Sequence, residues 1–156
     1  MPRSTMDVDV VAELDLGQVE RFIAMLGDGY YADAETIRDA VRRYASFNLI
    51  HLPTMFKVDV FIAPVDAFQA SMRDRAAAGR PSDADRAYPF ATAEDVILSK
   101  LRWYREGGGT SEKQWSDILS IIQVQGDRLD RDYLRKWAQH LDLAPLLERV
   151  FSDAED

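Results

Sequence analysis

Three aspartates on two short valine-rich segments are the residues of this sequence whose types and spacing could do chemistry. Asp7 and Asp9 alternate with valines, and Asp59 stands in a similar stretch, residues 57–62. In an extended strand alternate side chains share a face, so Asp7 and Asp9 point the same way. If the two segments are neighbouring strands, the three carboxylates converge, and such a set suits a hard cation, Mg²⁺ or Mn²⁺. The chemistry to expect is metal-assisted phosphoryl transfer.

A second interpretation of the paired acids, Asp7 and Asp9, is structural. Acidic residues on a strand also increase solubility and block edge-to-edge pairing. Aspartate is nevertheless depleted in strands, so its appearance twice within a valine-rich strand favours a metal role.

Composition limits the kinds of site that this chain can form. Its 156 residues are 47% hydrophobic, which is enough for one compact domain with a core. The absence of cysteine excludes disulfides, thiolate zinc sites and cysteine nucleophiles, and leaves His51 and His140 as imidazole ligands. Because no apolar run approaches the ~20 residues that span a bilayer, we expect a soluble, cytoplasmic protein without a membrane partner.

The charge balance bears on nucleic-acid binding. Nineteen basic and 27 acidic residues give a formal net charge of −8, which repels polyanions. A local basic patch is an alternative for one polar stretch, whose flanking arginines are Arg73, Arg75, Arg80 and Arg86. A solvated surface is the more common role of such charges.

Apolar spacing predicts the elements that position the three aspartates. Helical periodicity covers residues 19–26 and resumes after Asp33, a predicted N-cap, with Tyr44 on the apolar face of the second helix. Residues 47–51 and 57–62 are predicted to be the two strands of an antiparallel hairpin.

The rest of the chain is predicted to be helical. A helix is expected over residues 66–78, and the polar segment 79–89 holds the best candidate boundary. Capping boxes at Thr92 and Ser111 start two helices separated by a glycine turn; another begins near Asp130, and a short last one is followed by a frayed tail, residues 153–156. The expected fold is therefore α+β (mixed α/β): a small mixed sheet packed with helices in residues 1–90, then a helical bundle in residues 91–152 of the same compact unit.

Several strings in the sequence resemble bacterial nucleotidyltransferase-like proteins related to the AbiEii toxin group. These strings are PRSTMDVDVV, FNLIH, KVDVFI and, most specifically, AEDVILSKLRWYREGGGTSEKQWSDILSII. The resemblance extends over nearly the whole chain. It implies a DNA polymerase β-like nucleotidyltransferase fold, in which paired acids and a third strand acid bind two Mg²⁺ ions.

Carried over to this sequence, the resemblance assigns metal binding to Asp7 and Asp9. Asp59 completes the set and helps to activate the attacking hydroxyl. One ion lowers the pKa of the acceptor hydroxyl while the other neutralises charge on the triphosphate, which explains the need for three acids.

The resemblance also assigns nucleotide binding to four further residues. Lys100 corresponds to a lysine near the nucleotide phosphates, Asp117 to the acid after it, and Arg3 and Ser4 precede the paired acids. At 100° per residue, Lys100 and Asp117 fall at the borders of apolar helix faces. Such positions reach a cleft or form an inter-helix salt bridge, and the spacing leaves both alternatives open.

The function implied is transfer of a nucleoside monophosphate from an NTP to a hydroxyl on RNA or protein, with Mg²⁺ or Mn²⁺ as cofactor. A toxin role with an antitoxin as partner extends the same resemblance. The alternative is a catalytically inactive interaction or regulatory module that has lost triphosphate binding.

The interpretation as an inactive module depends on where the sequence starts. Related proteins carry a Gly-Gly or Gly-Ser turn just upstream of the paired acids, and this sequence starts at Met1, within the loop that follows that turn. Either the start is assigned too late or the protein is a shortened member. A shortened sheet has an unpaired edge, from which we expect a homodimer or other oligomer.

Other conspicuous residues have structural interpretations. His51 is expected to be a satisfied core or edge histidine. Trp103, Trp115 and Trp137 stand at helical spacing from apolar residues and are expected to pack. Glu94 lies near the middle of an apolar face, where an acid requires a partner, so we expect it to cap or brace a neighbouring helix.

Overall fold

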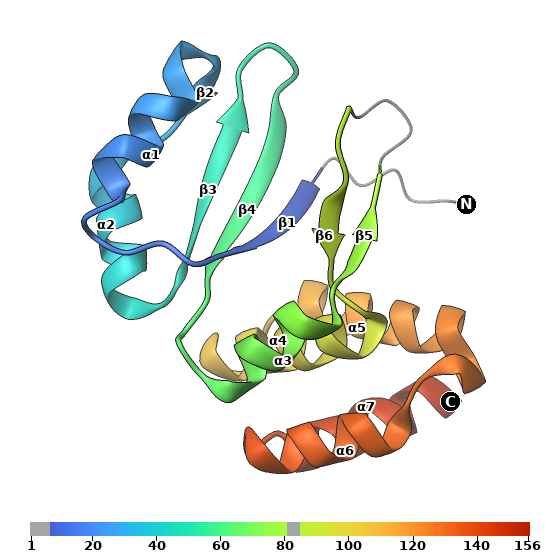
Figure 1. Ribbon diagram of the computed structural model, residues 1–156. Helices are drawn as coiled ribbons and strands as arrows, with labels where there is room; N and C mark the ends of the chain where they lie inside the picture. Colours follow the sequence, from blue (N-terminus) through green and yellow to red (C-terminus); the bar gives the residue numbers. More distant parts are fainter. Residues whose placement is uncertain (1–6, 81–84) are drawn as a thin grey trace. The chain divides into compact units, whose positions relative to one another are not determined.

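The computed structural model of this protein describes residues 7–80 and 85–156 (Figure 1). The chain divides into two compact units, Met1–Gln69 and Ala70–Asp156, and the division falls within helix α3 (Ala67–Arg75). The first unit combines a sheet with helices, and the second is mainly helical, so the α+β class predicted from the sequence is confirmed. The polar segment 79–89, which held the predicted boundary, lies within the second unit.

A four-stranded mixed sheet forms the centre of the first unit. Its strand order is β1-β4-β3-β2, with β1 (Asp7–Ala12) parallel to β4 (Phe56–Ile62). Strand β3 (Ser46–His51) is antiparallel to β4, and β2 (Tyr30–Tyr31) is antiparallel to β3. The predicted hairpin of β3 and β4 is therefore confirmed.

Helices α1 (Val19–Leu26) and α2 (Ala34–Arg43) lie on one side of this sheet (Figure 1). A short 3₁₀ helix, Gly27–Gly29, follows α1. The apolar core between helices and sheet consists of the buried side chains of Val19, Ile37, Ala40, Val41, Phe47, Leu49, Val60 and Ile62. Because strand side chains alternate between faces, Asp59 projects to the face opposite its core-facing neighbour Val60.

The ends of α2 show how local sequence defines a helix. Asp33 is the predicted N-cap, and its carboxylate accepts a hydrogen bond of 2.9 Å from the backbone N–H of Thr36. The prediction that Tyr44 lies on the apolar face is wrong, because Tyr44 ends the helix with a left-handed backbone (φ +50°) and is 53% exposed. A residue in that conformation leaves the helical path, so its side chain leaves the apolar face.

Four helices form most of the second unit: α4 (Ala93–Glu106), α5 (Glu112–Gln125), α6 (Arg131–His140) and α7 (Ala144–Glu155). Helix α4 packs against α5 and α6, and α7 packs against α5 and α6. A 3₁₀ turn, Gly126–Arg128, links α5 to α6. The fully buried side chains include Ile97, Leu98, Leu101, Ile118, Leu134, Leu143, Leu147 and Val150.

The helix starts predicted by the capping residues are confirmed. Hydroxyls of Thr92 and Ser111 accept bonds of 3.2 and 3.3 Å from the backbone N–H groups three residues later. Asp130 caps α6 in the same way, accepting a bond of 2.9 Å from the backbone N–H of Tyr133. Such bonds satisfy donors that have no partner inside the helix.

The predicted extent of the helix at the start of this unit is wrong. The helix expected over residues 66–78 ends at Arg75, and a short hairpin follows it, with β5 (Ala77–Gly79) antiparallel to β6 (Tyr88–Phe90). Three-residue strands carry too little alternation to be predicted from sequence. Gly79 permits this pairing, because a Cβ atom there would lie 2.6 Å from the ring of Phe90.

The C-terminal segment also differs from the expected frayed tail. Helix α7 continues to Glu155. The indole N–H of Trp115 donates a hydrogen bond of 3.0 Å to the carboxylate of Asp153, which ties this last turn to α5. Tertiary contact of this kind stabilises a helix end that its own sequence does not cap.

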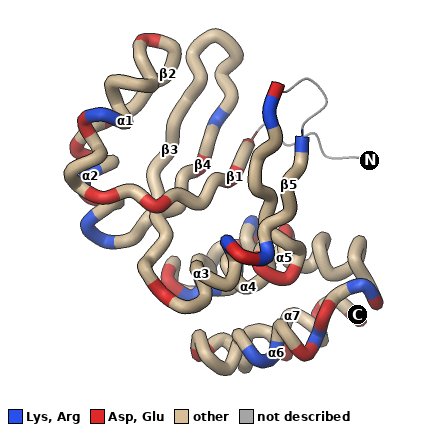
Figure 2. The backbone as a smooth tube through the Cα atoms, viewed as in Figure 1, with Lys and Arg blue, Asp and Glu red and all other residues tan. Residues whose placement is uncertain are grey.

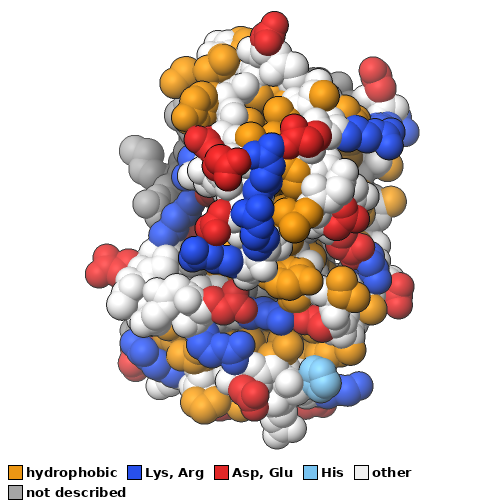
Figure 3. All heavy atoms as spheres, turned by 90° about the vertical axis from the view of Figure 1, so that its left-hand side faces the viewer, with side chains coloured by type: hydrophobic (Ala, Val, Ile, Leu, Met, Phe, Trp, Pro, Cys, Tyr) orange, Lys and Arg blue, Asp and Glu red, His pale blue; other side chains and the backbone are white. Residues whose placement is uncertain are grey.

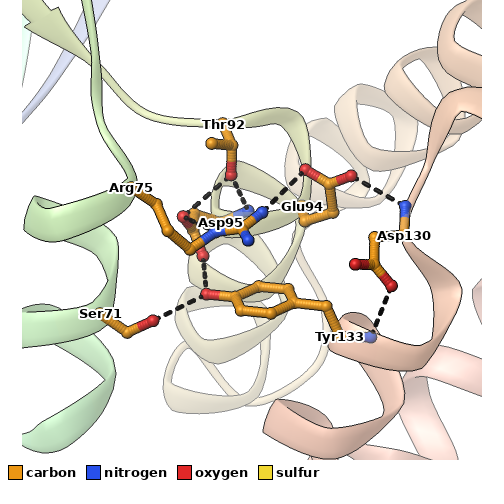
Figure 4. Close-up of polar contacts among 7 residues, drawn as sticks. All are labelled: Ser71, Arg75, Thr92, Glu94, Asp95, Asp130 and Tyr133. Atoms are coloured by element: carbon orange, nitrogen blue, oxygen red, sulfur yellow. Dashed lines mark hydrogen bonds and ion pairs between the residues drawn. The ribbon is translucent and has the colours of Figure 1, made fainter.

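A buried carboxylate connects three helices of the second unit (Figure 4). Asp95, at the start of α4, is fully buried. Its Oδ1 accepts a bond of 2.6 Å from the hydroxyl of Tyr133 on α6, and its Oδ2 accepts bonds of 2.9 Å from Thr92 and 3.3 Å from Arg75 at the end of α3. A buried charge is tolerated when every oxygen has donors of this kind.

Glu94 completes this network, as Figure 4 shows. Its Oε1 accepts a bond of 2.9 Å from the backbone N–H of Asp130, and its Oε2 lies 3.5 Å from Arg75. The expectation that Glu94 braces a neighbouring helix is confirmed. Arg75 therefore serves an internal network rather than a basic patch, and its guanidinium lies 3.7 Å from the centre of the Tyr133 ring.

Replacing Asp95 tests whether this network holds the second unit together. Asp95→Ala removes the carboxylate that accepts from Tyr133 and Thr92 and pairs with Arg75, so we expect the free energy of unfolding to fall by about 2–4 kcal/mol. Urea denaturation followed by circular dichroism measures this change. Lys136→Ala, at an exposed position of α6, is the matched control and should change it by less than about 0.5 kcal/mol. An unchanged urea midpoint for Asp95→Ala would contradict the assignment.

The same network predicts a pH dependence. Burial and the bond to Asp95 raise the pKa of Tyr133 to about 12. An unfolded tyrosine titrates near pH ~10, so the stability gained from the neutral phenol is complete below pH ~10 and is lost as pH rises through about 12. Tyr133→Phe cannot ionise, and the stability difference between wild type and Tyr133→Phe should therefore shrink over this interval. Urea midpoints measured at several alkaline pH values check this, and parallel curves would contradict it.

Candidate functional site

The register of β1 and β4 brings the three aspartates to one face of the sheet. Asp9 is the direct neighbour of Asp59, and Asp7 is the direct neighbour of Lys57. Side chains at paired positions share a face, and residues two apart on a strand share it too. These four side chains therefore lie on the face opposite the apolar core of the first unit.

Lys57 is a member of this cluster that the sequence analysis did not single out. Its Nζ lies 3.4 Å from Oδ2 of Asp59 and 3.8 Å from Oδ2 of Asp7. Figure 2 shows acidic positions on β1 and acidic and basic positions on the adjacent β4. The signal available in the sequence was the spacing of Lys57 and Asp59, two residues apart and hence on one face of their strand.

The cluster is open to solvent to different degrees. The side chain of Asp59 is 14% exposed, whereas those of Asp7 and Lys57 are 35% and 38% exposed. Asn48 on β3 is paired with Asp59 and shares the same face, so an amide oxygen is available beside the carboxylates. Because Asp7 and Asp9 are more exposed than Asp59, a solvated cation can approach this face from the side of β1.

Whether these residues can hold a divalent cation depends on the type of their donor atoms and on their arrangement. Within residues 7–80 and 85–156, no three His, Asp or Glu side chains are arranged to hold a metal ion. The donor type is that of a hard-cation site, because three carboxylates share one face, but their arrangement is not, and Lys57 lies at ion-pair distance from two of them. Metal binding by Asp7, Asp9 and Asp59 therefore stays a prediction from the sequence.

Lys100 and Asp117 form an ion pair within the second unit. The Nζ of Lys100 donates bonds of 3.1 Å to the Asp117 carboxylate and to Oε1 of Gln114, which joins α4 to α5. The side chain of Lys100 is 7% exposed. Of the two alternatives left by the spacing, the structure contains the inter-helix salt bridge. Arg3 and Ser4, assigned to nucleotide binding by the resemblance, lie outside the described residues.

His51 and Trp115 have the structural environments expected of them. The Nδ1 of His51 is 2.7 Å from the hydroxyl of Thr54, and its ring lies 5.0 Å from that of Tyr30. Trp115 packs 4.9 Å from the ring of Tyr104. Beside these two rings lies a hollow of about 310 Å³, which Leu119 and Arg149 also line. None of the residues predicted for metal or nucleotide binding lines it.

The surface over α1 and α2 carries charges of both signs. Acidic and basic side chains are intermixed with apolar ones on this side of the first unit (Figure 3). Arg38 pairs with Glu20 and Glu35, and Arg43 pairs with Asp39 at 3.1 Å. In the part of the chain that the structure describes, no helix is both long and apolar enough to cross a membrane.

Comparison with known proteins adds no relative for this chain. No model of a protein family matches it, and a search of curated proteins gives no match.

The Lys100–Asp117 pair makes a testable prediction about stability. Asp117→Ala removes the carboxylate that pairs with a nearly buried ammonium, so we expect the free energy of unfolding to fall by about 1–3 kcal/mol. The urea midpoint measures this, and Asp127→Ala, at an exposed position just after α5, serves as the control. Equal midpoints for the two variants would show that the pair contributes nothing to the fold.

Proposed function

We propose that this protein is a divalent-metal-dependent nucleotidyltransferase that moves a nucleoside monophosphate from an NTP to a hydroxyl on RNA or protein. The observation that carries the proposal is the β1–β4 register, which sets Asp9 beside Asp59 and Asp7 beside Lys57 on one face. The string resemblance supports the reaction class. A toxin role, an antitoxin partner, a cytoplasmic location and a homodimer belong to the same proposal.

The proposed chemistry divides between the metal and the chain. When bound, Mg²⁺ or Mn²⁺ lowers the pKa of the acceptor hydroxyl and neutralises charge on the triphosphate. The β1–β4 register places Asp7, Asp9 and Asp59 on one face of the sheet, and we assign them as the metal ligands. Of the two acids that contact Lys57, Asp59 is the less exposed. We assign to Asp59 the orientation of the acceptor hydroxyl.

Substitution of the paired acids tests this proposal. Asp7→Asn and Asp9→Asn each remove a ligand charge, and we expect transfer to fall at least about 100-fold, since even groups that only support metal ligands change activity by roughly 10- to 100-fold. Transfer from each α-labelled NTP to RNA and protein acceptors, with Mg²⁺ or Mn²⁺, measures this. Asp28→Asn, at an exposed acid of the first unit, controls for lost negative charge.

Two results would count against the enzyme. One is the absence of transfer by the wild type with every NTP and both metals. The other is equal transfer by the wild type, Asp7→Asn and Asp9→Asn, because the carboxylates would then have no part in the reaction.

A non-catalytic interaction module is the second candidate, and one observation favours it. The ammonium of Lys57 already compensates charge on Asp7 and Asp59, as in a structural ion-pair cluster. Isothermal titration calorimetry with Mg-NTP separates the candidates. Tight binding contradicts the module, whereas no heat together with a stable protein complex supports it.

A further inference from the structure

The hairpin of β5 and β6 in the second unit carries two aromatic side chains on one face. Tyr88 and Phe90 are two residues apart on β6, so their side chains point to the same face of the strand. They are 41% and 51% exposed, and in the part of the chain that the structure describes this sheet consists of β5 and β6 alone (Figure 1). The two rings therefore face solvent rather than a core.

The neighbouring strand leaves this face open. Strand β5 consists of two alanines and a glycine, and Gly79 and Ala77 are the direct neighbours of Tyr88 and Phe90. A Cβ atom at Gly79 would lie 2.6 Å from the ring of Phe90, so this ring rests on the glycine backbone. Small residues beside large rings form a flat surface, on which another planar group can stack.

Arginines lie at the loop end of both strands. The guanidinium of Arg86 lies 5.0 Å from the centre of the Tyr88 ring, and Arg86 precedes Tyr88 by two residues. Arg80 directly follows β5 (Figure 2). Asp85, next to Arg86, offsets part of this charge. The hairpin thus combines exposed rings with guanidinium groups that bind phosphates and stack on planar groups.

This combination fits a single-stranded polynucleotide. Alternate side chains on a strand are roughly 7 Å apart, and aromatic residues on a sheet surface stack two or three successive bases of single-stranded RNA. A duplex keeps the faces of its bases stacked on one another, so its bases are not accessible to these rings. The occupant expected from this chemistry is an unpaired strand whose bases lie on the rings and whose phosphates meet the arginines.

A protein partner fits the same surface less well. Aromatic side chains that anchor a protein interface lie among other well-packed side chains, whereas the neighbours of these rings are alanine, glycine and arginine. The formal net charge of −8 also opposes binding of nucleic acid by charge alone. Stacking therefore has to supply most of the affinity, and the dependence on salt should be shallow.

We propose that the β5–β6 hairpin binds single-stranded RNA, with bases stacked on Tyr88 and Phe90 and with Arg80 and Arg86 at the phosphates. The choice of RNA rests on the proposed function, which has RNA among its hydroxyl acceptors. The inference goes further by naming RNA, rather than protein, as the acceptor and by assigning a surface that holds it.

RNA binding in the absence of NTP and metal tests the inference. A fluorescein-labelled RNA of about ten uridines, which forms no duplex, is titrated with the full chain and followed by fluorescence anisotropy. Tyr88→Leu keeps an apolar side chain and removes the ring, so we expect its dissociation constant to rise at least about fivefold. Tyr88→Phe keeps the ring and should bind like the wild type. Tyr31→Leu, at a 59% exposed tyrosine of β2, is the matched control and should also bind like the wild type.

The role of Arg86 is tested through its charge. Arg86→Gln should weaken binding and reduce the slope of the logarithm of the binding constant against the logarithm of salt concentration by about 0.7, the value for one phosphate of a single strand. Arg43→Gln removes one positive charge at a side chain that is 72% exposed on α2, and should leave the slope unchanged. Urea midpoints establish that each variant folds, and Phe90→Leu repeats the comparison if Tyr88→Leu folds poorly.

Three results would overturn the inference. No RNA binding at about 100 μM protein, the weak end of non-specific affinities, is the first. Equal dissociation constants for the wild type, Tyr88→Leu and Tyr31→Leu are the second. The third is a dimer in light scattering that Tyr88→Leu dissociates while RNA affinity stays unchanged, because the hairpin would then join two copies of the chain. Tighter binding to DNA than to RNA of the same length would overturn the choice of RNA.

Failure of this inference is distinguishable from failure of the proposed function. Transfer of a nucleotide to a protein acceptor, without RNA binding, overturns the role of the hairpin and leaves the enzyme standing. RNA binding that Tyr88→Leu weakens and Asp7→Asn leaves unchanged, in a chain that transfers no nucleotide, supports the hairpin and removes the enzyme.

Discussion

The parallel pairing of β1 with β4 is the constraint on which the rest of the first unit depends. It joins residues about fifty positions apart and sets Val10 opposite Val60 and Asp9 opposite Asp59. Val60 is 4% exposed on the core face of β4, whereas Val8 and Val10 of the edge strand β1 are 45% and 39% exposed, so the burial that stabilises this sheet comes from β4 rather than from β1. The register sets the acids of the edge strand β1 beside Asp59 of the buried strand β4, and this pairing forms the candidate site.

The two units contain acids in opposite physical situations. Asp95 is fully buried and accepts hydrogen bonds from Arg75 on α3, Tyr133 on α6 and Thr92, the N-cap of α4. Such a carboxylate is fixed in one arrangement, because loss of a donor leaves a buried oxygen unsatisfied. Asp7 is 35% exposed and shares an ammonium with Asp59. Water can replace a lost partner there, so these acids are less tightly fixed than Asp95. The first kind of acid stabilises a fold, and the second kind is suited to binding.

Short sequence patterns predicted the helix starts correctly, because a capping hydrogen bond joins residues that are close in the sequence. Asp33, Thr92, Ser111 and Asp130 each cap a helix through a hydrogen bond that spans three residues. The predictions that failed depend on contacts made elsewhere in the chain. The β5–β6 hairpin depends on a glycine that accommodates the ring of Phe90, and the last turn of α7 depends on the bond from Trp115 to Asp153. No pattern within a short window contains that information.

Alternation along a strand depends only on the backbone, and for this reason the sequence by itself determined that Asp7 and Asp9 share a face. It also determined that Glu94 needs a partner, because an acid on an apolar helix face cannot remain unpaired. Only the tertiary structure decided which residue stands beside each acid. Strand register and helix packing are set by the joint burial of distant apolar side chains. They bring Lys57 to Asp7, Lys100 to Asp117 and Arg75 to Asp95, and so decide which carboxylates are buried in the fold and which stay partly exposed.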